Sequence, residues 1–183
     1  MSKNPLKQLS YLRADIRRWQ YASIKEAFYI IFEPGLWAVI IYRFGRFLFL
    51  IDIPVVKIFI RFIAYLMMKV SEILFGVSIK AGTDIGPGLF IGHTGAVIVH
   101  PNAQIGENLS IGTGVIIGER GLGKGGYPII GNDVYVGVGA KILGNIKIGN
   151  KVKIGANAVV VKDIPDGSTA VGVPARIIHE VKE

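Results

Sequence analysis

Between Gly35 and Phe75 the chain is mostly apolar, with single charged residues at wide intervals. In the second half of this segment polar residues recur about once per helical turn, at Lys57, Arg61, Tyr65, Lys69 and Glu72. This spacing predicts an amphipathic helix with a narrow polar stripe and a wide apolar face. Because proline lacks an amide hydrogen and disfavours helix before it, Pro54 should separate this helix from another at about 35–50.

The wide apolar face of this helix has two interpretations. It packs against the rest of the protein or a subunit interface, or it lies in the boundary of an anionic membrane while Lys and Arg meet lipid headgroups. No apolar run reaches the roughly 20 residues that a spanning helix needs. Residues 1–34 also read as helix, with a break at Glu33-Pro34-Gly35. We treat them as part of the mature protein, because the pattern of a signal peptide is absent.

Beyond Gly76 a period of six residues replaces the helical pattern. One aliphatic residue recurs at every sixth position: Ile130, Val136, Ile142, Ile148, Ile154 and Val160. A second apolar residue stands four places after each of these: Val134, Ala140, Ile146, Val152, Ala158 and Ile164. Earlier hexads begin at Ile79, Ile85, Ile91, Val99, Ile105, Ile111 and Ile117. Such a period predicts a parallel β-helix, in which three hexads close one triangular turn and stacked turns bury a continuous column.

Two interruptions of the period point to a functional face. The register slips by two residues just after His93, and the segment 118–129, GERGLGKGGYPI, is too rich in glycine and polar residues to continue the column. We expect this segment to loop out, because insertions at solenoid corners project from one face, which is commonly where ligands bind. The predicted organisation is a helical cap at 1–76, a β-helix at 77–175 with the loop 118–129, and a tail at 176–183.

Charge and composition narrow the classes of function. The net charge of +8 is concentrated in residues 1–76, which hold eleven Lys/Arg against five Asp/Glu. These cations alternate with aliphatic residues and no recognition motif is present, which argues against nucleic-acid binding. The chain has no cysteine, so thiolate zinc sites and thiol nucleophiles are excluded. The three histidines lack ligand partners at metal-binding spacing, so no metal site is predicted. The composition is compatible with the cytosol.

Several motifs together resemble the serine acetyltransferase branch of the hexapeptide-repeat acyltransferases, including relatives that act in surface-polysaccharide synthesis. The motifs are YRFGRFLF at 42–49, IGHTGAVIV at 91–99, GAKILGNIKIG at 139–149, GANAVVVKDIP at 155–165 and GVPAR at 172–176. The resemblance implies a left-handed β-helix, a homotrimer, and acetyl-CoA bound in a groove between neighbouring subunits.

The resemblance also assigns chemistry to residues of this chain. It implies that His93 is the general base that takes the proton of the acceptor hydroxyl, and imidazole titrates near neutral pH as this role requires. Glu119, Asp84 or a backbone carbonyl is the candidate to orient His93. Tyr127 is a candidate hydrogen-bond donor to the acceptor or to pantetheine, although a tyrosine in a loop can also simply pack.

The differences from the serine enzymes concern the acceptor. Those enzymes carry an arginine and a second histidine before the loop proline, where this chain has Gly126 and Tyr127. Gly92, a candidate acceptor-site position, replaces an aspartate before the first histidine, and Asp15 is the one acidic candidate that remains. Because a free amino acid needs a cation for its carboxylate, we expect a sugar hydroxyl of a surface polysaccharide or lipid-linked glycan as acceptor. Serine O-acetylation for cysteine biosynthesis is the alternative.

Candidate contacts to acetyl-CoA lie at the repeat corners. Gly139, Ala140, Gly155 and Ala156 are small enough for close approach of the pantetheine arm, and Lys162 and Lys124 are candidate phosphate partners. The predicted localisation is cytoplasmic, and a lipid-linked acceptor would place the enzyme peripherally on the inner face of the membrane. The alternative from another class of function is a non-catalytic trimeric scaffold at a membrane.

Overall fold

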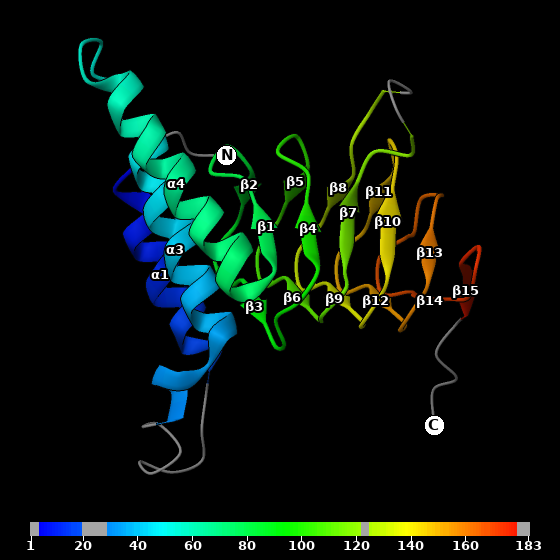
Figure 1. Ribbon diagram of the computed structural model, residues 1–183. Coiled ribbons are helices and arrows are strands. Elements are labelled where there is room, and N and C mark those ends of the chain that lie inside the picture. Colours follow the sequence, from blue (N-terminus) through cyan, green and yellow to red (C-terminus); the bar gives the residue numbers. More distant parts are fainter. Residues whose placement is uncertain (1–3, 20–28, 122–124, 179–183) are drawn as a thin grey trace.

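A computed structural model describes residues 4–19, 29–121 and 125–178, and shows a triangular solenoid with helices at one end (Figure 1). The helices are α1 (Lys7–Arg17), the 3-10 turn η1 (Ile30–Phe32), α3 (Pro34–Phe49) and α4 (Lys57–Phe75). Short parallel strands then form three sheets along the solenoid. The predicted left-handed parallel β-helix with an N-terminal helical cap is therefore confirmed.

Each of the three sheets forms one side of the prism. The first sheet contains β1 (Val77–Ile79), β4 (Val97–Val99), β7 (Ile116–Gly118), β10 (Lys141–Leu143) and β13 (Val159–Val160). The second contains β2 (Asp84–Ile85), β5 (Gln104–Ile105), β8 (Ile129–Ile130) and β11 (Lys147–Ile148). The third contains β3 (Phe90–Ile91), β6 (Ser110–Ile111), β9 (Tyr135–Val136), β12 (Lys153–Ile154), β14 (Thr169–Val171) and β15 (Arg176–Ile178).

The hexad residues form the core, as the period predicts. All twelve repeat positions from Ile130 to Ile164 that the six-residue period defines are buried, and so are the seven earlier hexad starts from Ile79 to Ile117. Full burial of a Val or Ile side chain contributes about 1.5–3 kcal/mol. The column therefore holds the coils together, and the residues between its members are free to face solvent.

Two edges of the prism carry the residues with predicted functional roles. The His93 edge joins the third sheet to the first, through corners 92–96, 112–115, 137–140 and 155–158. The loop edge joins the first sheet to the second, through corners 80–83, 100–103, 119–128 and 144–146, and continues at 161–163. Between the paired residues Ile91↔Ile111 and Ile98↔Ile116, the turn that contains His93 is two residues longer than the turn stacked on it, which accounts for the register slip in the sequence.

The cap is attached to the first coil by buried polar contacts. Arg43 of α3 pairs with Asp15 of α1, and its guanidinium also donates to the backbone carbonyls of Ile85 and Gly86 at 2.8 and 2.6 Å. The hydroxyl of Tyr42 donates to the carbonyl of Thr83 at 2.8 Å, and burial raises the pKa of this phenol. These bonds fix α1 and α3 against the solenoid.

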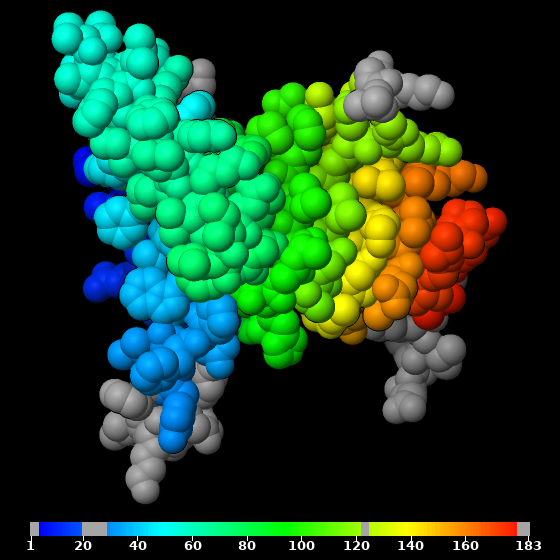
Figure 2. Space-filling model, in the orientation of Figure 1, coloured from blue at the N-terminus to red at the C-terminus, as the bar shows by residue number. Residues whose placement is uncertain are grey.

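Helix α4 buries only part of its wide apolar face. Ala64, Met68 and Ser71 are buried, whereas the opposite side is exposed, with Ile58 at 82% and Ile73 at 79%. Figure 2 shows this outer side of α4 uncovered at the N-terminal end of the prism. Within the described part of the chain, no helix is both long and apolar enough to cross a membrane.

The C-terminal end differs from the predicted tail. Residues 176–178 form β15, which pairs antiparallel with β14. This reversal covers one open edge of the last coil, and a sheet edge left uncovered would offer unpaired backbone groups to other chains.

Candidate active site

His93 lies in the lengthened corner of the His93 edge, with its side chain exposed. The corner is held from the coil above, where the Thr113 hydroxyl and the Gly114 amide both donate to the Gly95 carbonyl, at 2.7 and 2.8 Å. Ala96 has a φ of 53°, a left-handed conformation that an alanine seldom adopts. Such strained positions persist where surrounding contacts fix them, and they cluster at functional sites.

The helical cap supports the His93 corner from below. Gly35, in the first turn of α3, lies so close to Ile91 that a Cβ added there would sit 2.0 Å from the Ile91 carbonyl oxygen. The ring of Trp19 packs on Phe90 with 4.6 Å between ring centroids. Gly92 lies beside the same Phe90 ring, which a Cβ at position 92 would approach to 3.2 Å. The packing of the cap therefore sets the position of the backbone that carries His93.

The candidate cofactor residues of the repeat lie on the same edge as His93. Gly139 and Ala140 belong to corner 137–140, and Gly155 and Ala156 to corner 155–158. Ala156 is exposed, and Gly139 and Gly155 are partly exposed, but the Ala140 side chain is fully buried in the core column. Ala140 therefore has a core role. The other three line an edge of low side-chain bulk that leads to His93.

Glycine at 139 also has a structural reason. Its φ is 71°, and a Cβ there would lie 2.1 Å from the Asn157 side-chain oxygen of the next coil. The turn thus requires glycine whether or not a ligand binds, and the predicted functional role of Gly139 rests on its place on the His93 edge.

The remaining candidates lie on the loop edge. Glu119 and Tyr127 belong to the protruding loop, and Lys162 is exposed in the segment 161–163. Lys124 lies outside the described residues. A three-residue strand of the first sheet separates the two edges, and it rises about 10 Å. One chain therefore does not bring His93 together with Glu119 or Tyr127.

Asp84, the other candidate to orient His93, is also away from it. It lies in β2 of the second sheet and pairs with Arg46 at 2.6 Å. Within the described residues no side-chain carboxylate of the same chain hydrogen-bonds His93. The partner that orients its imidazole remains a prediction for the assembled protein.

Asp15 occupies a structural position. Its side chain is fully buried, one oxygen accepts from Arg43 Nε at 2.7 Å, and the other accepts from the amides of Gly88 and Leu89 at 2.8 Å each. This arrangement leaves no free surface for an acceptor. The contacts argue against the predicted acceptor role and assign Asp15 to the attachment of the cap.

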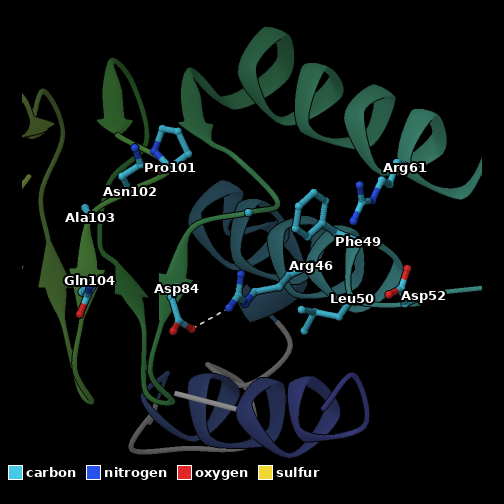
Figure 3. A pocket seen from close by; sticks show the side chains of 11 residues that line it. Arg46, Phe49, Leu50, Asp52, Arg61, Asp84, Pro101, Asn102, Ala103 and Gln104 are labelled. Carbon is cyan, nitrogen blue, oxygen red and sulfur yellow. Dashed lines mark hydrogen bonds and ion pairs between the residues drawn. The ribbon is translucent and has the colours of Figure 1, made fainter. Parts of the chain in front are cut away.

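A cavity of about 880 Å³ opens at the loop edge, between the cap and the first two coils (Figure 3). Its charged lining residues are Arg46, Asp52, Arg61 and Asp84. Arg46 is only 5% exposed and pairs with Asp84, while its Nε has no partner within the described chain.

The second arginine of the cavity, Arg61, is exposed and lies over the Phe49 ring, with its guanidinium carbon 4.9 Å from the ring centroid. Asp52 pairs with Lys57, whose hydrogen bond lowers the pKa of this carboxyl. The cavity could not be predicted from the sequence, because its walls come from α3, α4 and two separate corners.

His100, for which the sequence predicts no role, lies beside Tyr127 in the structure. The two rings stack with centroids 4.2 Å apart and planes inclined by 17°. The six-residue period predicts that both residues lie on the loop edge. It does not predict that they touch, because the protruding loop is long and its path does not follow from the period.

Comparison with known proteins agrees with this architecture. Residues 127–162 match the family model "Bacterial transferase hexapeptide (six repeats)". A serine acetyltransferase of Helicobacter pylori is 41% identical over 81% of this chain and 84% of its own length. One from Mycobacterium tuberculosis is 37% identical over 94% of this chain and 74% of its own. The crystal structure of Neisseria gonorrhoeae serine acetyltransferase in complex with serine superposes with a TM-score of 0.80 and 31% identity, covering 95% of this chain and 70% of that chain.

A six-residue solenoid with an exposed histidine on an edge of small residues defines a hexapeptide-repeat transferase. Within that class, the chain belongs to the serine acetyltransferase family, whose members are acetyl-CoA-dependent O-acetyltransferases.

Proposed function

We propose that the protein is a serine O-acetyltransferase, which transfers the acetyl group of acetyl-CoA to the side-chain hydroxyl of L-serine. The observation that carries the proposal is the exposed His93 in a lengthened corner, in line with Gly139, Gly155 and Ala156. The similarity to serine acetyltransferases over most of the chain favours serine, the alternative acceptor in the sequence analysis, over a sugar.

His93 is the general base of the proposed reaction. Acetyl-CoA supplies the thioester carbonyl, and the serine oxygen forms a bond to that carbon as the bond from carbon to sulfur breaks. His93 takes the hydroxyl proton during the attack and returns it to the departing sulfur. A positioned general base contributes about 10²–10⁴-fold to such a step.

We further propose that two neighbouring chains of a homotrimer form each site. Tyr127 and the cavity lie on the loop edge, separated from His93 of the same chain by the first sheet. Placing the loop edge of one chain against the His93 edge of the next would bring them to one acceptor. Sedimentation velocity should show a trimer, and a monomer with full activity would contradict the shared site.

The carboxylate of serine requires a cation, and we assign Arg61 to it. Arg46 is already paired with Asp84. Arg61 has no carboxylate within ion-pair distance among the described residues, and the Phe49 ring holds its guanidinium at the cavity wall. A planar guanidinium can hold a carboxylate through two parallel hydrogen bonds.

A sugar hydroxyl is the second candidate acceptor, and one observation favours it. Gly126 has a φ of 90°, and a Cβ there would lie 2.2 Å from the Asn145 Cβ. The loop in this conformation does not accommodate an arginine at 126, so the carboxylate contact expected from the family resemblance is absent at that position.

Membrane association remains a prediction, supported by the exposed apolar side of α4. Co-sedimentation with vesicles that contain anionic lipid tests it.

The central experiment measures thiol release from acetyl-CoA with L-serine and with nucleotide- or lipid-linked sugars, for the wild type and His93→Ala. We expect turnover with serine that falls by about 10²–10⁴-fold in the variant. Asp133→Asn, an exposed change away from both edges, is the matched control and should retain activity. Turnover with a sugar alone would overturn the choice of acceptor, and turnover independent of His93 would overturn the mechanism.

A further inference from the structure

His100 and Tyr127 form a stacked pair on the loop edge, although 27 positions separate them in the sequence. Their ring centroids are 4.2 Å apart and their planes are nearly parallel. His100 begins corner 100–103, and Tyr127 is the penultimate residue of the protruding loop. The stack therefore connects the end of the loop to the coil beneath it.

The imidazole of His100 is fixed independently of the tyrosine. Its Nδ1 accepts a hydrogen bond from the Asn102 amide at 3.2 Å, which assigns the proton of the neutral ring to Nε2. The His100 backbone is anchored too, because its amide donates to the Ile117 carbonyl at 2.8 Å. His100 thus presents a ring face of set orientation on which Tyr127 rests.

The backbone on either side of Tyr127 is equally constrained. Gly126 lies against Asn145 at a distance that excludes any side chain. Pro128 is buried, and its carbonyl accepts from the Gln104 amide at 3.1 Å. With the backbone fixed on both sides, the stack on His100 selects the direction of the Tyr127 side chain.

The pair lies on the same edge of the prism as the cavity, next to one part of its lining. Pro101 and Asn102, the two residues that follow His100, line that cavity. Within the described residues the phenolic hydroxyl of Tyr127 has no hydrogen-bond partner, and its side chain is only partly buried. A tyrosine held against a rigid ring, with a hydroxyl that has no partner in the described chain, is suited to donate a hydrogen bond to a ligand that binds at this edge.

We propose that His100 is a positioning residue that holds Tyr127 so that the Tyr127 hydroxyl donates a hydrogen bond to the acceptor. The proposal rests on the proposed acetyl transfer and names two residues on the acceptor side of that site. Tyr127 contacts the acceptor, and His100 acts only through Tyr127. Acetyl-CoA, placed along the His93 edge, should not depend on either ring.

The test is a double-mutant cycle with His100→Ala, Tyr127→Phe and the double variant, in which kcat and the KM of each substrate are measured. Loss of one neutral hydrogen bond should raise the KM for serine by about 3- to 10-fold in Tyr127→Phe. His100→Ala should match this increase, and the double variant should be no worse than either single variant, because both remove the same contact. The KM for acetyl-CoA should not change.

His100→Phe separates positioning from general stability. Phenylalanine keeps the stacking face but loses the Nδ1 hydrogen bond from the Asn102 amide that orients the ring, so we expect a KM for serine between those of the wild type and His100→Ala. Thermal melting of each variant reports the fold. A folded His100→Ala with an unchanged KM for serine would overturn the proposal, as would additive effects or a KM in His100→Phe as high as that in His100→Ala. A wild type without turnover on serine would instead contradict the proposed function itself.

Discussion

Asp15 and Arg43 form a buried ion pair between α1 and α3, in which Arg43 Nε donates a 2.7 Å hydrogen bond to Asp15 Oδ2. Both side chains are at most 1% exposed, and their remaining polar atoms bond to backbone groups of the first coil. Buried charges are tolerated when their hydrogen bonds are satisfied in this way. The pair thereby attaches the cap to the coil that precedes the His93 corner.

Asp15→Asn should destabilise the protein by about 3–5 kcal/mol, because it leaves the charge of Arg43 buried without its anion. Urea unfolding followed by circular dichroism measures the loss. Asp133→Asn makes the same chemical change at an exposed position and should shift stability by no more than about 0.5 kcal/mol. If folded Asp15→Asn showed a raised KM for serine with unchanged stability, the acceptor role of Asp15 would be restored.

Gly35→Ala tests the support of the His93 corner by the cap. The new Cβ would lie 2.0 Å from the Ile91 carbonyl oxygen, so α3 or the strand must move. We expect a loss of about 1–3 kcal/mol in stability, as for other overpacked positions, together with a lower kcat. In Gly82→Ala the nearest atom is Phe49 Cζ at an ordinary 3.5 Å, and the melting temperature should not fall. Unchanged melting and kcat in Gly35→Ala would show that the contact does not position His93.

The core of the solenoid could be predicted from the sequence because its determinants are local and periodic. Ile130, Val136 and the other hexad residues are buried wherever the six-residue spacing placed them. Ala140 shows the limit of that reasoning. It follows Gly139 in the predicted cofactor corner, yet its side chain belongs to the column.

The polar sites were harder to predict because their partners are distant in the sequence. Asp15 of α1 forms an ion pair with Arg43 of α3, and Arg46 pairs with Asp84, which lies 38 positions further along the chain. Neither pairing follows from periodicity, since it depends on how α1 and α3 pack against the first coil. The stack of Tyr127 on His100 likewise depends on the path of the protruding loop.

Arg61→Gln should raise the KM for serine by about 10-fold or more, because a hydrogen bond between charged groups is stronger than one between neutral groups. The KM for acetyl-CoA should stay constant, and Arg61→Lys, which keeps the charge, should show a smaller increase. Serinol, which lacks the carboxylate, provides the sharper comparison. The preference of the wild type for serine over serinol should shrink in Arg61→Gln, and a preference that stays constant would remove Arg61 from the carboxylate site.

The solenoid should lose one stabilising contribution at low pH through Asp166. Its oxygens accept hydrogen bonds from the Asn150 side chain at 3.1 Å and the Asn150 amide at 2.9 Å, and these bonds lower the pKa of the carboxyl below its usual value. A carboxyl with a lower pKa in the folded state stabilises the fold above its unfolded pKa of about 3.9, and this stabilisation disappears as the pH falls through the folded pKa.

Asp166→Asn cannot titrate, so it isolates this contribution from the other carboxylates. The wild type should melt above Asp166→Asn at pH 6, and the difference should shrink at pH values below about 4. Scanning calorimetry of both proteins over this range measures it. A difference that stays the same from pH 6 to pH 3 would contradict this prediction. It would mean that the two hydrogen bonds from Asn150 stabilise the ionised and the protonated carboxyl of Asp166 equally.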